Sequence, residues 1–523
     1  MTLGERIPDT GRKFDRSNAI TLFWFALFAF LGALAIFLLL QRLGLPTEVV
    51  VFAIATFGII AIVGLSWISR TMNSPLFFFA NRALGAFTSG LGSTTDLLSG
   101  AMLVLFFSTH LAGKMVIASG LVLGILLQAA LFSAAIQRSA VSNVPGFFTW
   151  RFQRKIVGYP ALLVTFAVLL LFAMAEFQVA KNILHVQTGL PLEQTALIIA
   201  ILAVLPSLFG GWTGLLLVNA TLTIWILVCT LVPAAATGFF AHILGRELEL
   251  GFLRSPLESL ELLPLTILFG PDGDPSGLTI IVSVLAIAMG ASTLPHSLSR
   301  LSTNSREVEA IESVGWLALM VFLMFSALPL SVGLIIAPPT SDNLAAILQS
   351  QPVLQMLPYF VILFAALNAL AATLFAAASS MVRASSRLRN VNPAERSVFV
   401  TRLCVLLFAA MLVKWPEALT PSPEHLLVGA LMVCAGGLFV PLAAGAWLAS
   451  VSARSASAAI GAGAAIAALM LIPIPHVPPI PAVWAGTAGA LVALAILARE
   501  QFLLAKNKEQ KEINSSVQAL RHH

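Results

Sequence analysis

Apolar runs of about 20 residues recur along this sequence, and each is long enough to cross the hydrocarbon core of a bilayer as a helix. A helix satisfies all of its backbone hydrogen bonds within the segment, which a membrane span requires. The runs fall at 20–41, 49–69, 85–110, 113–137, 158–183, 191–212, 214–240, 278–298, 311–336, 354–382, 401–414, 424–449, 455–472 and 481–499. The pattern predicts an all-α polytopic membrane protein with about 14 transmembrane helices.

Composition indicates the same class. The chain of 523 residues is 59% hydrophobic and 10% charged, whereas soluble domains carry about 25% charged residues. So much apolar surface cannot be buried in one water-soluble core, and the lipid bilayer must be the solvent for much of it. The three cysteines lie in apolar runs at spacings that predict neither a metal site nor a disulfide.

Basic residues in the short loops predict the orientation. The net charge of +6 is typical of basic cytoplasmic loops, and we expect no nucleic-acid partner. With a cytoplasmic N-terminus, most Lys and Arg residues, Arg300 included, fall on the cytoplasmic side. The outside retains only Arg42, Lys114, Arg246, Arg254 and Lys414. We therefore expect a multi-pass protein of the cytoplasmic (inner) membrane of a bacterium, with both termini cytoplasmic and a polar tail from Lys506 that is a frayed helix or disordered.

The third apolar run carries the densest group of polar residues. Its segment Ser89–Gly100 (SGLGSTTDLLSG) places three glycines, several hydroxyls and a carboxyl group inside a membrane span. Such a group is typical of a broken helix that lines a binding site at the midplane of a transporter. A seam of small residues that lets two helices approach is the alternative. Thr94, Thr95, Asp96 and Ser99 are the candidate substrate-binding residues of this segment.

Other predicted spans also contain polar residues. Glu176 of the fifth span either pairs with Lys181 or faces a vestibule, and both interpretations stay open. Asn219 opens the seventh span and Asn368 lies within the tenth, where an amide requires a partner from another helix or a cavity water. With Gln178, these residues join the candidate substrate-binding set.

Motifs of enzymes are absent from the sequence. We find no phosphate-binding P-loop, no HExxH zinc motif and no GxSxG nucleophile elbow. We therefore expect no catalytic residues, no enzyme activity, no cofactor and no bound metal beyond a coupling ion.

Five segments together are similar to elements of the sodium:solute symporter family. They are Phe77–Gly85 (FFFANRALG), Thr94–Ala101 (TTDLLSGA), Val144–Phe152 (VPGFFTWRF), Gly210–Asn219 (GGWTGLLLVN) and Leu294–Trp316 (LPHSLSRLSTNSREVEAIESVGW). The last is the most specific, because it resembles the family's Leu-Pro-His…Arg stretch at the inner end of a core helix. The resemblance covers about residues 70–450.

The resemblance implies a core of five plus five helices in an inverted repeat of the leucine-transporter-like type. The corresponding divisions are 1–84 with two peripheral transmembrane helices, 85–240 as the first repeat, 241–277 as an external loop that could hold an interfacial helix, 278–449 as the second repeat, 450–499 with two further helices, and 500–523 as a cytoplasmic tail. The second broken helix would be the eighth, with Ala288–Thr293 (AMGAST) as its flexible part and Ser292 as a candidate substrate-binding residue.

The ion site implied by the resemblance is degenerate. The family's sodium ligands correspond to carbonyl groups of Thr95 and Leu98 and to three positions on the tenth helix. Those three positions hold Ala366, Ala369 and Leu370, so both side-chain hydroxyls are missing. Thr373, one turn further along, is a substitute ligand that could shift the ion. The acetate and monocarboxylate permease branch of the family is similar in lacking these groups. We therefore expect weak or no coupling to sodium, with a proton as the natural substitute.

Two functions remain open from the sequence. The first is a symporter-like secondary active transporter of a small organic solute, such as a monocarboxylate. The alternative is a membrane sensor or regulatory protein that keeps the symporter fold without coupled transport. Its partner would be a two-component system or a small membrane protein.

Overall fold

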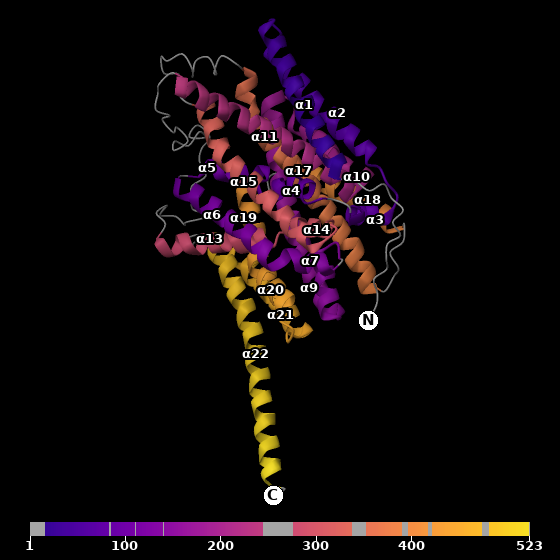
Figure 1. Ribbon diagram of the computed structural model, residues 1–523, viewed down its shortest axis with the longest axis vertical. Coiled ribbons are helices and arrows are strands. Elements are labelled where there is room, and N and C mark those ends of the chain that lie inside the picture. The colour runs from indigo at the N-terminus through magenta and orange to yellow at the C-terminus, as the bar shows by residue number, and fades with distance from the viewer. Residues whose placement is uncertain are drawn as a thin grey trace.

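The computed structural model describes residues 16–82, 85–109, 111–139, 141–243, 276–336, 352–389, 396–416, 421–472 and 481–521. Every regular element within these ranges is a helix, and none is a strand. The helices form a tightly packed bundle, and the C-terminal helix projects from it (Figure 1). Most of the predicted external loop 241–277 lies outside the described residues.

The N-terminal helices α1 (Arg16–Arg42) and α2 (Thr47–Ile68) lie against one side of the bundle. Trp225 packs against both helices. Its ring stacks on Phe30 of α1 and Phe57 of α2 at centroid distances of 4.9 and 5.2 Å. Its indole N–H donates to the carbonyl of Ala26 on α1 at 3.1 Å. A buried indole needs such a partner for its N–H, so these contacts fix where α1 packs. The short α3 (Ser74–Phe79) and η1 (Ala80–Arg82) lead into the bundle.

The bundle itself contains two consecutive groups of helices and a C-terminal pair. The first group is α4 (Ala86–Leu97), α5 (Gly100–Ser108), α6 (Leu111–Leu127), η2 (Gln128–Ser133), α7 (Ala134–Ser139), α8 (Val144–Phe152), α9 (Lys155–Thr188), α10 (Leu192–Gly210) and α11 (Trp212–Ile243). The second is α13 (Gly277–Ser292), α14 (Pro295–Leu301), α15 (Glu307–Ile336), α17 (Pro352–Arg389), α18 (Arg396–Lys414), α19 (Pro423–Cys434), η5 (Ala435–Phe439) and α20 (Val440–Trp447). The pair is α21 (Ala453–Met470) and α22 (Ala482–Arg521).

The described helices confirm an all-α multi-pass membrane fold. Eleven of them are long and apolar enough to cross a membrane, and the count is 13 if each of two bent helix pairs is one span. Each of the 14 apolar runs of the sequence contains a helix, but α2 offers only the shorter apolar stretch Phe52–Ile68. The internal five-plus-five repeat stays a prediction.

Two spans are bent, as the sequence predicts. α4 and α5 form a pair bent by 50° at Leu98 and Ser99, and α13 and α14 form a pair bent by 49° at Thr293 and Leu294. Ser99 has the extended backbone of an N-cap and its hydroxyl accepts from the N–H of Met102, so α5 starts as a new helix. The second bend lies at the end of the AMGAST segment, before Pro295, whose missing N–H suits the first position of a helix.

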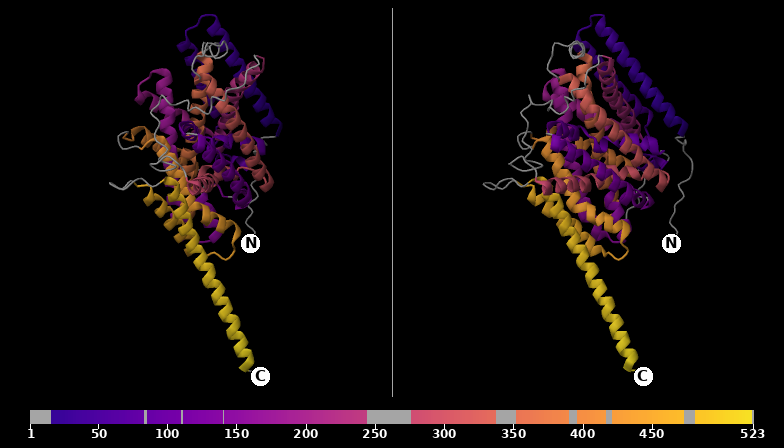
Figure 2. Two further views of the ribbon diagram at one scale, coloured as in Figure 1. Left: turned by 90° about the vertical axis from the view of Figure 1, so that its left-hand side faces the viewer. Right: turned by 60° about the vertical axis from the view of Figure 1, so that its left-hand side comes forward.

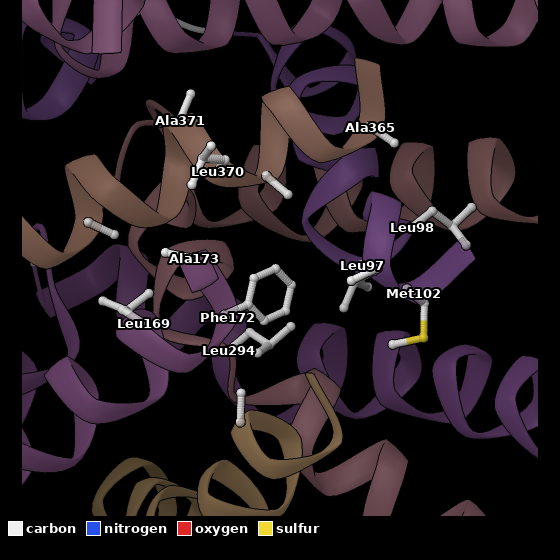
Figure 3. Packing of buried hydrophobic residues seen from close by; sticks show 14 of the residues in the cluster. Leu97, Leu98, Met102, Leu169, Phe172, Ala173, Leu294, Ala365, Leu370 and Ala371 are labelled. Carbon is white, nitrogen blue, oxygen red and sulfur yellow. The ribbon is translucent and has the colours of Figure 1, made fainter. Parts of the chain in front are cut away.

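Small residues let the helices around the first bend pack closely. A Cβ atom on Gly100 would lie 2.5 Å from the Cβ of Ala366, so α5 begins directly against α17. A Cβ on Gly90 would likewise lie 2.5 Å from the Cβ of Trp316 on α15. Figure 3 shows the centre of the bundle, where Phe172 of α9 lies among apolar side chains of other helices, including Leu97, Leu294 and Leu370. All four are buried, so the centre is closely packed.

The C-terminal helix extends well beyond the rest of the molecule. α22 has 40 residues, of which Ala482–Asn507 form its candidate membrane span (Figure 2). Helix continues without a break from there to Arg521, where the sequence led us to expect a frayed helix or disorder from Lys506. A helix of this length needs no cap within the polar segment, because backbone hydrogen bonds propagate from the packed part.

Candidate functional site

A buried ion pair connects the two bent spans. A guanidinium nitrogen of Arg300 on α14, Nη2, lies 2.8 Å from Oδ1 of Asp96 on α4, and both side chains are fully buried. The other guanidinium nitrogen, Nη1, donates to the carbonyl oxygen of Gly92, also on α4. The guanidinium group lies over the ring of Trp212 at 5.5 Å from its centroid. The short helices on either side of the bundle centre are thus held together by opposite charges.

Two asparagines extend the ion pair to two further helices. With the amide of Asn219 turned so that its oxygen faces Arg300, that oxygen accepts from Nη2 at 2.7 Å. The Asn219 amide nitrogen then donates to the carbonyl of Leu215 and to Oδ1 of Asn368, both at 3.1 Å. In return, the Asn368 amide donates to the backbone carbonyl of Asn219 at 3.3 Å. We call Asp96, Arg300, Asn219 and Asn368 the core network; it joins α4, α14, α11 and α17.

The core network is expensive to keep buried. Removing two charges from water costs several kcal/mol per ion, and their attraction offsets this cost only if the remaining donors and acceptors are also bonded. Here the carbonyl of Gly92 and the Asn219 amide supply two of those bonds, whereas Nε of Arg300 and Oδ2 of Asp96 have no hydrogen-bond partner. Buried ionic groups inside membrane spans typically mark functional sites.

The loop-charge count places Arg300 among the basic residues of the cytoplasmic side. The structure adds that its side chain, on α14, is fully buried and paired with a residue of another helix. The signal that could have found it is the requirement for a cation near Asp96, together with the Pro295 break five residues before Arg300.

Glu176 adopts an arrangement different from the two considered from the sequence. Its carboxyl group, carried by α9, is fully buried at the start of α5. The N–H of Ala101 donates to it, at 3.1 Å to Oε2 and 3.4 Å to Oε1. The hydroxyl of Ser99 and the N–H of Gly100 face the same carboxyl group. Glu176 therefore binds the N-terminus of the second half of the first bent span.

The remaining hydroxyl candidates bond mainly to their own helices. Thr94 donates to the carbonyl of Gly90 at 3.0 Å, and Ser292 donates to that of Met289 at 3.0 Å. Thr95 differs, because its hydroxyl is buried and has no hydrogen-bond partner. Of these three candidates, Thr95 alone retains an unused polar group beside the first bend.

The positions of the degenerate ion site are apolar and enclosed. Leu98, Ala366, Ala369 and Leu370 are each fully buried. The hydroxyl of Thr373, the substitute ligand, donates to the carbonyls of Ala369 and Leu370 at 2.9 Å each. That hydroxyl still has lone pairs, but its proton is held by its own helix. The close approach of Gly100 to Ala366 places the first bend beside these α17 positions.

His296 is a polar residue at the second bend that the sequence did not single out. It lies in the first turn of α14, fully buried, and its ring centroid is 4.8 Å from that of Phe172. The backbone of Asp96 faces its imidazole. Buried polar groups are generally hydrogen-bonded, so this contact links the second bend to α4. The signal in the sequence is the Leu-Pro-His element, which places a histidine at the break in the eighth span.

Gln178 lies apart from the core network. It lines a pocket of about 180 Å³ toward the C-terminal end of α9, together with Met174, Phe177, Lys181, Asn182, Leu412 and Trp415. Its amide donates to the carbonyl of Pro421 at 3.4 Å. Apart from the hydroxyl residues Thr94, Thr95 and Ser292, the candidate substrate-binding residues thus divide into the core network, the Glu176 contact with α5, and this pocket.

Comparison with known proteins gives a fold but no family. No protein-family model matches the sequence, and no curated protein matches it. Membership of the sodium:solute symporter family therefore stays a prediction.

Solved structures resemble the whole bundle. A Na+-coupled sialic acid symporter, solved in a substrate-bound outward-open state, is 13% identical in sequence and superposes with a TM-score of 0.64 over 87% of this chain and 96% of that one. A nucleobase-cation-symport-1 family transporter is 15% identical with a TM-score of 0.48, over 84% of this chain and 97% of that one. A manganese transporter of Eremococcus coleocola is 13% identical with a TM-score of 0.46, over 83% and 96%. The first of these similarities shows that this chain has the fold of leucine-transporter-like membrane transporters.

Proposed function

We propose that this chain is a secondary transporter that moves a small organic solute across the cytoplasmic membrane. The observation that carries the proposal is the buried ion pair between Asp96 and Arg300, which joins two bent spans at the centre of the bundle. Bent spans that meet near the midplane are the usual place for a solute site in transporters with discontinuous helices. The likeness to the sialic acid symporter supports the same reading at the level of fold.

The ion pair links solute binding to movement of the bent spans. α4 and α14 are short helices, each separated from the rest of its span by a bend of about 50°, and the core network attaches both of them to α11 and α17. A solute that competes for one member of the network would weaken the attachment of both short helices. Alternating access requires this type of coupled change.

The coupling ion that we propose is a proton rather than sodium. Sodium needs several oxygen ligands to replace its water shell, and the corresponding α17 positions hold Ala366, Ala369 and Leu370. The carboxyl groups of Asp96 and Glu176 are the described groups at the first bend that can take up and release a proton.

Uptake into proteoliposomes tests the proposed function. A panel of labelled acids, amides, amino acids and sugars would be offered to the parent, to Asp96→Asn and to Glu193→Gln, a control at an exposed position in the first turn of α10. We expect at least one compound to accumulate with the parent and the control and not with Asp96→Asn. Equal uptake by Asp96→Asn, folded and reconstituted to the same level, would remove the ion pair from the mechanism.

A sensor is the second candidate, and one observation favours it. The positions that correspond to ion ligands are filled by buried apolar side chains, so a driving ion has few oxygen atoms to bind there. A sensor would bind a solute without accumulating it. Saturable binding to the purified protein, with no uptake of the same compound in vesicles under sodium or proton gradients, would support the sensor over the transporter.

A further inference from the structure

The first bend creates two helix ends with opposite partial charge inside the bundle. α4 ends at Leu97 and α5 begins at Gly100. Unbonded carbonyl groups give the end of a helix a partial negative charge, and unbonded N–H groups give its start a partial positive charge. The start of α5 is therefore a natural place for an anion, such as the carboxylate of a solute.

The protein's own charged side chains lie at this bend, and one of them occupies the start of α5. Arg300 donates to the carbonyl of Gly92 and pairs with Asp96 near the end of α4. At the start of α5, the carboxyl group of Glu176 accepts from the N–H of Ala101 and faces that of Gly100. The chain thus supplies the bend with one cation, Arg300, and two carboxyl groups, those of Asp96 and Glu176.

No N–H group of the first turn of α5 is left for a solute anion. The N–H of Gly100 and Ala101 are directed to Glu176. That of Met102 donates to the hydroxyl of Ser99 at 3.3 Å, and that of Leu103 donates to the carbonyl of Ser99 at 2.9 Å. A free carboxylate arriving here would meet a carboxyl group and find no donor.

We propose that Glu176 is a built-in occupant of the anion position at the first bend, and that it sets the charge of the solute. Resting on the proposed function, the inference is that the solute is uncharged or cationic where it meets this bend, so a free monocarboxylate is not the substrate. The occupancy of the helix start by Glu176 does not itself depend on transport. The two parts are therefore tested by separate experiments.

Chemical rescue tests the occupancy. Glu176→Ala removes the terminal CH2 and carboxyl group from a fully buried place, and acetate has the size of the missing fragment and the charge of its ionised form. The thermal unfolding midpoint of the purified variant would be measured in acetate, in acetamide and in chloride at equal ionic strength. We expect Glu176→Ala to unfold several degrees below the parent, and acetate to restore much of that loss while acetamide and chloride do not.

The controls define what would overturn the occupancy. The parent and Glu193→Ala, which changes an exposed residue, should respond equally to acetate and chloride. Stabilisation of the parent by acetate to the same extent as the variant, or equal rescue by acetamide, would contradict it. If Glu176→Ala is recovered folded only when purified in acetate, the yield in acetate against acetamide becomes the readout, with the same interpretation. If Glu176→Ala is recovered folded in neither acetate nor acetamide, Glu176→Gln is tested in its place. Binding of acetate to folded Glu176→Gln would show that the carboxyl group does not fill the site.

Solute charge is tested by competition in vesicles. Pairs of compounds that differ only in carboxylate against carboxamide would compete with uptake of the transported probe by the parent. We expect the amides to compete and the acids not to compete. Stronger competition by the acids would overturn the specificity while leaving the rescue result intact. If no compound is taken up at all, the proposed function fails, and the rescue result alone decides whether Glu176 fills the anion position.

Discussion

At the scale of single residues, the buried ion pair between Asp96 and Arg300 makes each partner depend on the other. Asp96→Leu leaves the guanidinium of Arg300 buried without its counter-charge, and Arg300→Met leaves the carboxylate alone. Breaking a buried pair by removing one partner typically costs about 3–5 kcal/mol. We expect each single variant to lose stability in this range, as measured by thermal unfolding in detergent.

The double variant Asp96→Leu with Arg300→Met provides the matched comparison. Replacing a whole buried pair by apolar residues of similar size is often neutral, so the double variant should be more stable than either single change. It should also be inactive in uptake, because the bent spans lose their link. Stability losses that simply add would show that the two side chains act independently.

A second residue-scale prediction concerns the close contact between α5 and α17. Gly100→Ala places a methyl group 2.5 Å from the Cβ of Ala366 and 2.8 Å from the carbonyl of Ile362, so one helix must shift. Overpacking of this kind typically costs about 1–3 kcal/mol. Gly461→Ala on α21 is the control, because its Cβ would meet nothing within 4 Å. An unfolding midpoint unchanged in both variants would contradict the tight contact.

At the scale of elements, the sequence predicted the positions of the bends, but it did not predict which side chains meet there. Gly, Ser and Thr near Asp96, and the AMGAST segment before Pro295, weaken a helix locally, and local chemistry is readable from sequence. The contact of Glu176 with Ala101 joins residues 75 positions apart, and that of Arg300 with Gly92 joins residues 208 apart. Such pairs depend on how helices are placed in space, which no local pattern encodes. The partners of Arg300 could therefore not be predicted from the sequence around it.

The Ser99 cap yields a prediction for the element that it begins. Ser99 accepts from the N–H of Met102 and its hydroxyl faces Glu176, so Ser99→Ala removes a cap and one neighbour of the carboxyl group. Loss of a helix N-cap costs about 0.5–2 kcal/mol. Thermal unfolding should show a loss in this range for Ser99→Ala and a smaller one for Ser99→Thr. A larger loss for the threonine would mean that packing, not capping, decides the residue at this position.

At the scale of the whole molecule, we expect transport without a steep dependence on sodium. The α17 positions beside the bend offer no side-chain oxygen at Ala366, Ala369 or Leu370, so a dehydrated sodium ion has too few ligands. Uptake of the transported probe would be measured against external sodium at fixed pH, and then against pH without sodium. A saturable sodium dependence that disappears when Ala369 is replaced by a bulky residue would show that the ion site works after all.

The orientation of the chain is a further prediction at this scale. Basic residues concentrate at 138–155 and 383–402, which predicts that these segments and both termini face the cytoplasm. Removing Arg300 from the count does not change the asymmetry. Reporter fusions at residues 147, 256 and 392 would check it, and we expect an external signal only at 256. A cytoplasmic signal at 256 would require a different topology.

The length of α22 has a practical consequence for imaging. Beyond Asn507 the helix continues to Arg521, which at a rise of about 1.5 Å per residue carries the chain about 20 Å past its candidate span. A 55.4 kDa protein that lies mostly within a detergent micelle offers few features for aligning particles in electron cryo-microscopy. A small rigid domain that begins with a helix could be fused after Arg521 so that the two helices form one continuous helix. It would add a feature for alignment outside the micelle, at a fixed angle to the bundle.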